Sequence, residues 1–147
     1  MPLLSRSTLD PVTATSICEL RVRFSETDLM GIVHHAAYLP YFEVSRVHWL
    51  RRRGITYRDW AASGLHLPVV DASCKYLKPA FFDDVLHVHA TADEMRTASL
   101  RFSYVIYRGE ERVAEGMTRH ACVNAEHRPI RMPPAVVDVL RASELPA

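Results

Sequence analysis

The sequence lacks the long apolar runs that a membrane-spanning helix or a signal peptide requires, and it carries almost no excess charge. Its formal net charge is +1 over 147 residues, so no overall field gathers nucleic acid or an anionic membrane. Lysine is nearly absent: Lys75 and Lys78 stand alone, and arginine supplies the other fixed positive charges. These absences favour a cytoplasmic protein with no membrane insertion and no nucleic-acid partner.

Cysteine is also scarce, and no metal-type spacing is present. Cys18, Cys74 and Cys122 are an odd number in alternating apolar stretches, which predicts free thiols rather than a disulfide framework. His87 and His89 alternate along one strand face, but no third ligand stands at a suitable spacing. We therefore expect no metal site and no cofactor.

The length of the chain suits one domain, and no repeat or low-complexity linker divides residues 1–147. Residues 1–15 hold two prolines and several serines and threonines, which is typical of a loose N-terminal arm. The arm is expected to precede a single folded unit.

The hydrophobic pattern predicts an α+β fold. Residues 18–24 alternate as a half-buried strand, and residues 36–53 carry aromatic side chains at the three- and four-residue steps of a long helix. Hairpin-linked strands and a short final helix, residues 135–140, are expected after Pro68. The four expected strands are residues 69–77, 85–92, 99–107 and 113–123. Consecutive antiparallel strands with one long helix to cover a face make a sheet wrapped around that helix.

The irregular segment between the first strand and the helix, residues 26–35, concentrates chemically active side chains. It holds two carboxylates, a glycine and two histidines. Backbone N–H groups at a helix start can stabilise an oxyanion, and a nearby carboxylate can attack a carbonyl or deprotonate water. The pattern alone is equally consistent with a structural role, in which Thr27 or Asp28 caps a turn and the histidines are solvated.

The stretch RVRFSETDLMGIVHHAAYLPYFEVSR resembles the signature of the 4-hydroxybenzoyl-CoA thioesterase-type hotdog family, including its YbgC-like acyl-CoA thioesterase branch. The matching positions are an aspartate and five residues that follow it at the intervals of the family: Asp28, Gly31, His35, Tyr38, Glu43 and Arg46. Residues 70–80 resemble the family's second strand and its exit. Matching order covers most of residues 17–124.

The resemblance implies a hotdog fold, a five-stranded antiparallel sheet wrapped around one long helix. It also implies a homodimer or homotetramer with acyl sites between subunits. The reaction would be hydrolysis of an acyl-CoA or acyl-carrier-protein thioester, with coenzyme A present only as part of the substrate. Asp28 would act as nucleophile or general base, backbone N–H groups around His35 would hold the thioester oxygen, and His35 would assist.

We expect Gly31, Val33, His34, Tyr38 and Glu43 to bind substrate. The resemblance places Glu43 near the pocket, whereas His34 lines the pocket or faces outward and Tyr38 belongs to the core or the pocket wall. His34 departs from the family, in which a tyrosine or another aromatic residue is common at this position. Glu43 has an alternative interpretation, because it stands three residues before Arg46 and can form a surface pair on the helix.

Two other functions stay open at this point. A non-catalytic acyl-thioester binding module would keep the fold without needing Asp28. A hotdog dehydratase or hydratase would need a histidine in a glycine- and proline-rich loop, which the sequence does not show. The acyl group, the carrier and the choice between attack by Asp28 and activation of water are not fixed by the sequence.

Overall fold

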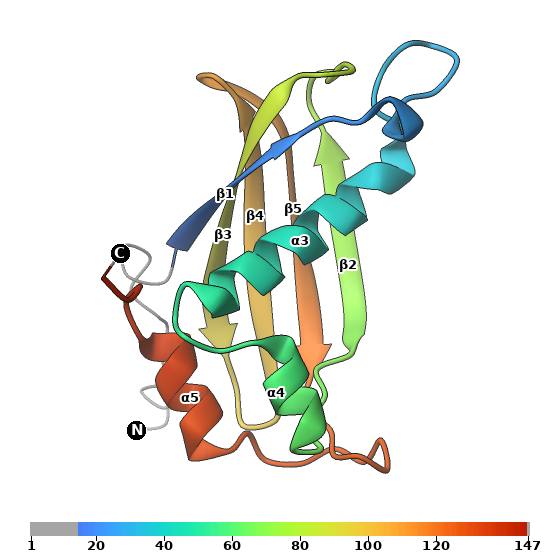
Figure 1. Cartoon of the computed structure of the whole chain (residues 1–147). Coiled ribbons are helices and arrows are strands. Elements are labelled where there is room, and N and C mark those ends of the chain that lie inside the picture. The colour runs from blue at the N-terminus through green and yellow to red at the C-terminus, as the bar shows by residue number, and fades with distance from the viewer. Residues whose placement is uncertain (1–14, 147) are drawn as a thin grey trace.

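The computed structural model describes residues 15–146, which form one five-stranded antiparallel sheet with a long helix across one face (Figure 1). The strands are β1 (Thr15–Arg21), β2 (Val69–Tyr76), β3 (Val85–Met95), β4 (Ser99–Arg108) and β5 (Glu111–Ala121). The helices are α3 (Tyr38–Arg51), α4 (Tyr57–Ala62) and α5 (Pro134–Arg141), and the 3-10 turns η1 (Phe24–Glu26) and η2 (His35–Ala37) precede α3. The predicted α+β architecture is confirmed.

The strand order is β1-β3-β4-β5-β2, so β1 and β2 form the two edges of the sheet. Strands β3, β4 and β5 are consecutive hairpins, whereas β2 reaches the far edge by pairing with β5. Figure 1 shows the loop before α3 beside the C-terminal end of β2, and α4 near the start of β2. The edge strand β2 therefore runs from the neighbourhood of α4 to the loop before α3 (Figure 1).

The core lies between α3 and the sheet. Phe42 stacks on Tyr104 of β4 with ring centroids 4.3 Å apart, and Trp49 meets Phe102 edge to face at 5.2 Å. Gly116 of β5 leaves room for the Phe42 ring, because a Cβ atom there would lie 2.3 Å from the Ser73 carbonyl oxygen and 2.7 Å from that ring. The predicted aromatic helix face is thus the face that the sheet buries.

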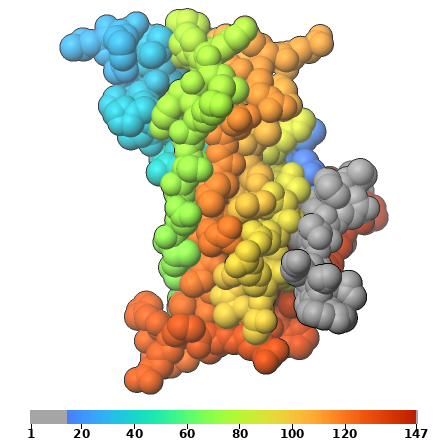
Figure 2. All heavy atoms as spheres, turned by 180° about the vertical axis from the view of Figure 1, so that it is seen from behind, coloured from blue at the N-terminus to red at the C-terminus, as the bar shows by residue number. Residues whose placement is uncertain are grey.

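Figure 2 shows the opposite face of the sheet, where strands lie side by side with no described helix over them. Polar and charged side chains of alternate positions occupy this face, as in the ion pair between Asp93 and Arg101. One covered face and one polar face is the pattern expected of an antiparallel sheet.

Several predicted boundaries shift. The first strand ends at Arg21, so the prediction that it continues to residue 24 is wrong: Phe24 begins η1 and is 76% exposed. The reason is local, because Glu26 accepts hydrogen bonds from the backbone and side chain of Arg23 and bends the chain there. The long helix starts at Tyr38, two residues later than expected, after η2, so Pro40 lies in its first turn.

The remaining boundaries agree within a few residues, except that β3 continues to Met95 through a bulge at Asp93. The predicted arm falls mostly on residues 1–14, which lie outside the described residues. Among the described residues no helix is long and apolar enough to cross a membrane. No cluster of three metal-ligating side chains occurs within residues 15–146.

Candidate active site

Asp28 opens a tight turn that projects from the loop before α3. Its backbone N–H donates to the Ile32 carbonyl at 2.9 Å, and the Gly31 N–H donates back to the Asp28 carbonyl at 2.9 Å. Gly31 has φ +81°, the left-handed conformation that closes a three-residue turn of this kind. Local sequence therefore fixes the turn: an aspartate at its start and a glycine at its end.

The Asp28 carboxylate is held by one oxygen. Oδ1 accepts a hydrogen bond from the Met30 N–H at 2.8 Å, which orients the side chain in the manner of an Asx turn. Oδ2 makes no hydrogen bond to any residue from 15 to 146. The turn-capping role that the sequence left open is thus present, and it leaves one carboxylate oxygen available for chemistry.

An open cavity of about 370 Å³ lies beside this turn. We call it the Asp28 cavity. It brings together four of the residues singled out from the sequence: Asp28, Val33, His35 and Tyr38. Met30, Ile32 and the strand exit Tyr76, Leu77, Lys78 and Pro79 complete its lining.

The N-terminal turn of the helix is held by histidine and tyrosine contacts. The Ala36 N–H donates to Nδ1 of His34 at 3.0 Å, and the rings of His34 and His35 stack 4.3 Å apart. The Tyr76 hydroxyl donates to the His35 carbonyl at 3.2 Å. Because His34 occupies the Ala36 N–H, the His35 N–H, which has no partner in the described chain, is the free donor at this helix start.

Tyr38 forms a wall of the Asp28 cavity and is almost fully buried. Burial raises the pKa of its phenol to about 12, so the hydroxyl stays protonated at neutral pH. The other carboxylate of the segment, Glu26, lies outside the cavity and accepts a hydrogen bond from Tyr41 at 2.8 Å. Burial acts to raise the Glu26 pKa, but hydrogen bonds from Arg23 and Tyr41 outweigh it and lower the pKa. Glu26 is thereby tied into the fold.

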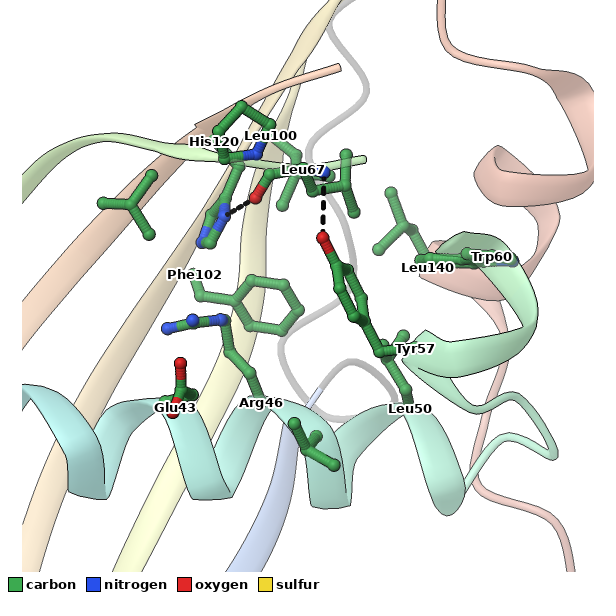
Figure 3. A pocket seen from close by; sticks show the side chains of 13 residues that line it. Glu43, Arg46, Leu50, Tyr57, Trp60, Leu67, Leu100, Phe102, His120 and Leu140 are labelled. Carbon is green, nitrogen blue, oxygen red and sulfur yellow. Dashed lines mark hydrogen bonds between the residues drawn. The ribbon is translucent and has the colours of Figure 1, made fainter. Parts of the chain in front are cut away.

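Glu43 lies elsewhere. It lines a second cavity of about 300 Å³ between α3 and the sheet, which α4 and α5 close at one end (Figure 3). We call this the Arg46 cavity. Most of its lining is apolar: Val47, Leu50, Trp60, Leu67, Pro68, Val69, Leu100, Phe102 and Leu140, with Glu43, Arg46, Tyr57 and His120 as the polar members. Glu43 and Arg46 do not form the ion pair that their spacing allowed.

A buried chain of hydrogen bonds borders the Arg46 cavity. Arg46 Nη1 donates to the Tyr104 hydroxyl at 3.2 Å, and that hydroxyl lies 2.6 Å from Thr118 Oγ1. Thr118 Oγ1 lies 2.8 Å from His120 Nε2, whose other ring nitrogen lies 2.9 Å from the Leu67 carbonyl oxygen. Sequence reasoning missed this group, although Thr118 and His120 alternate inward along β5 as Phe102 and Tyr104 do along β4.

His120 is neutral at ordinary pH. Burial lowers its pKa to about 4, with a smaller contribution in the same direction from the Arg46 charge, while the bond to the Leu67 carbonyl opposes the shift. A carbonyl oxygen only accepts, so Nδ1 carries the proton and Nε2 is the acceptor.

Comparison with known proteins identifies the family. A family model described as the thioesterase-like superfamily matches residues 22–140. The chain belongs to this superfamily. The resemblance seen in the sequence, a hotdog-type thioester hydrolase, is therefore confirmed.

Relatives within the thioesterase-like superfamily agree over most of their length. A 1,4-dihydroxy-2-naphthoyl-CoA hydrolase of Thermosynechococcus vestitus is 31% identical, with 73% of this chain and 75% of that protein covered. The acyl-CoA thioester hydrolase YbgC of Escherichia coli O157:H7 is 29% identical, covering 78% of this chain and 84% of its own.

The solved structure of a hypothetical protein, AQ1494 of Aquifex aeolicus, superposes with a TM-score of 0.83 at 38% identity. The superposition covers 85% of this chain and 98% of that chain. The superfamily fold thus extends over nearly the whole described chain.

Proposed function

We propose that the protein hydrolyses an acyl-CoA thioester and that Asp28 is its catalytic carboxylate. The observation that carries the proposal is the state of Asp28, beside an open cavity at the start of α3. One carboxylate oxygen is fixed by the Met30 N–H, and the other makes no hydrogen bond within residues 15–146. A carboxylate held in one orientation next to a helix N-terminus suits attack on a carbonyl, because little reorganisation precedes the reaction.

Two routes share this geometry. In the first, Asp28 Oδ2 bonds to the acyl carbon, the C–S bond breaks, and the coenzyme A thiolate leaves; water then cleaves the mixed anhydride. In the second, Oδ2 takes a proton from water, the water oxygen bonds to the acyl carbon, and the departing thiolate receives the proton. Both routes build negative charge on the thioester oxygen.

The His35 N–H is our candidate donor to that oxygen, since His34 already occupies the neighbouring Ala36 N–H. The His35 ring, Val33 and Tyr38 line the same cavity and would contact the thioester. Gly31 shapes the turn, and His34 would act on substrate indirectly by holding the turn that follows it.

A second copy of the chain would complete the site through the edge strand β2. Nearly all of β2 is exposed, including Val70 at 60% and Tyr76 at 50%. Its C-terminal end borders the Asp28 cavity and its start borders the Arg46 cavity, about 25 Å away for eight extended residues. Antiparallel pairing of two β2 strands about a two-fold axis would lay the Asp28 cavity of one protomer beside the Arg46 cavity of its partner.

Such pairing also gives Glu43 a place in the reaction. Within one protomer it lines a different cavity from Asp28, whereas in the paired arrangement it would face the acyl group attacked by the partner's Asp28. The Arg46 cavity would then take the acyl chain, because its walls are mostly apolar.

Thiol release from a panel of acyl-CoAs tests the catalytic proposal. Butanoyl-, hexanoyl-, decanoyl- and benzoyl-CoA are incubated with the protein and a thiol reagent, using Asp28→Asn and the control Asp138→Asn, an exposed aspartate of α5. Asp28→Asn should lower kcat by about 100-fold or more, and Asp138→Asn should not. Unchanged cleavage by Asp28→Asn would refute the role of Asp28. Binding without cleavage by the wild-type protein would favour a binding module, and hydration of an enoyl-CoA would favour a hydratase.

The pairing is tested separately by light scattering coupled to size-exclusion chromatography. Val70→Lys places a charge on β2, and the matched control Ile17→Lys places one on the other edge strand, where Ile17 is 50% exposed. We expect monomers from Val70→Lys and the parental assembly from Ile17→Lys. A dimer that survives Val70→Lys but not Ile17→Lys would place the interface at β1.

A further inference from the structure

The hydrogen-bond chain beside the Arg46 cavity runs in one direction. Because His120 Nδ1 donates to the Leu67 carbonyl, Nε2 accepts from the Thr118 hydroxyl. Thr118 Oγ1 then accepts from the Tyr104 hydroxyl, which in turn accepts from Arg46. Every member has a determined role, so the chain fixes the position of the Arg46 guanidinium.

The guanidinium has donors to spare. One of its N–H groups serves Tyr104, and within residues 15–146 the other N–H groups have no hydrogen-bond or carboxylate partner. In Figure 3 the Arg46 side chain rises from α3 towards the sheet, with the Phe102 ring next to it. No side-chain nitrogen or oxygen within residues 15–146 is both fully buried and without a partner, so these spare donors are reachable from outside the chain. They line the cavity and are available to an oxygen atom of a bound ligand.

We propose that Arg46 is a specificity-determining residue, which donates hydrogen bonds to an oxygen atom carried by the acyl group beyond its thioester. The inference rests on the proposed hydrolysis and on the pairing of β2 strands, which brings the Arg46 cavity to the partner's reacting centre. Tyr104, Thr118 and His120 are positioning residues that act through Arg46. The enzyme then selects oxygen-bearing acyl groups over plain hydrocarbon groups of the same length.

The neighbouring charge narrows the class of acyl group. Glu43 lines the same cavity, is exposed and makes no ion pair in the described chain. Its carboxylate repels an anionic tail and can accept a hydrogen bond from a neutral one. A hydroxyl matches both side chains, since its oxygen accepts from Arg46 and its proton is offered to Glu43. The favoured substrates are therefore hydroxyacyl thioesters.

The test compares hexanoyl-CoA with 6-hydroxyhexanoyl-CoA, and butanoyl-CoA with 4-hydroxybutanoyl-CoA, by thiol release. The wild-type protein should favour the hydroxylated member of at least one pair by about tenfold in kcat/KM. Arg46→Met keeps the length of the side chain without its donors and should abolish the preference, while Arg46→Lys should restore part of it. An undiminished preference in Arg46→Met overturns the proposal.

A matched pair of variants tests the chain itself. Thr118→Val breaks the connection between Tyr104 and His120, whereas Thr118→Ser keeps the hydroxyl. Thr118→Val should reduce the ratio of kcat/KM for the hydroxylated substrate to that for the plain substrate several-fold, and Thr118→Ser should restore this ratio. A structural role alone would lower cleavage of both substrates equally, and that result would remove Thr118 as a positioning residue.

The outcomes separate this inference from the proposed function. If the wild-type protein releases no thiol from any thioester, the hydrolysis fails as a proposal. The same pairs are then compared by isothermal titration. Equal affinities for hydroxylated and plain thioesters would overturn the role of Arg46 as well, and a preference that Arg46→Met removes would support it.

Discussion

The Asp28 cavity and the Arg46 cavity are built in opposite ways. Asp28 is oriented by a backbone N–H two residues away, in a turn closed by contacts among residues 28–32. Arg46 is oriented by side chains from β4 and β5, which lie more than fifty residues further along the chain. The proposed reacting group is thus fixed locally, and the proposed specificity group is fixed by the packing of the helix against the sheet.

A glycine-to-alanine substitution in each region should distinguish the two, and the larger loss of stability is expected at Gly116 in the sheet. In Gly116→Ala the new Cβ would lie 2.3 Å from the Ser73 carbonyl and 2.7 Å from the Phe42 ring, so β2 or α3 must shift. We expect a loss of about 3 kcal/mol in the free energy of unfolding, measured by urea denaturation. A loss below 1 kcal/mol would mean that the helix–sheet contact is looser than the structure indicates.

The pH dependence of stability should distinguish the buried chain from the exposed turn. His120 has a folded pKa of about 4 against 6.5 when unfolded, so the unfolded chain binds the extra proton between these values. The contribution of neutral His120 to the free energy of unfolding is fully present above pH 6.5 and is lost as the pH falls towards 4. Between pH 7 and 5 the loss should be roughly 2 kcal/mol.

His120→Asn removes the titration while retaining a donor towards the Leu67 carbonyl. Urea denaturation of both proteins at pH 7 and pH 5 isolates the contribution, because the other titrating groups are common to them. The variant should lose less stability than the wild-type protein over this range. Equal losses would show that His120 titrates normally.

Gly31→Ala is the local counterpart of Gly116→Ala. A Cβ at Gly31 meets nothing within 4 Å, and only the φ of +81° opposes it. The expected cost is about 1 kcal/mol of stability. The activity should fall by about tenfold or more, since relaxation of the turn displaces Asp28. Thermal unfolding measures the loss of stability, and thiol release from the same preparation measures the loss of activity. Unchanged activity would mean that the turn does not position Asp28.

The smallest effect is expected at Tyr76. Tyr76→Phe removes the hydrogen bond to the His35 carbonyl and should cost less than about 1 kcal/mol of stability. A modest decrease in kcat is expected without a change in KM, because the turn η2 loses one restraint next to the proposed oxyanion donor. Lys78→Met, a change at another residue of the same cavity, is a suitable comparison. A change confined to KM would point to substrate contact instead.

This contrast explains what the sequence predicted and what it did not. The alternating and helical spacing of apolar residues predicted the five strands and the long helix, because an element with one buried face repeats apolar residues at a regular interval. The turn at Asp28 was found from contiguous residues. Phe24 was misplaced, since the capping contacts between Arg23 and Glu26 break the alternation earlier than the apolar pattern does.

Tertiary contacts explain the remaining gaps. The use of the Ala36 N–H by His34 depends on a side-chain rotamer. The placement of Glu43 in a different cavity from Asp28 depends on how α3 packs against the sheet, α4 and α5. The link from Arg46 to His120 joins a helix to two strands. Contacts of this kind join residues far apart in the chain, so they produce no regular spacing that could be recognised in a single sequence.

A mixture of two variants tests most directly whether the two regions act together. Asp28→Asn and Arg46→Met protomers are unfolded, mixed and refolded, so that heterodimers form, and cleavage of the preferred hydroxyacyl-CoA is measured. A site built across the β2 interface predicts recovered activity, because one site of each heterodimer joins Asp28 of one protomer to Arg46 of the other. Activity no greater than the average of the two separately refolded variants would contradict the account.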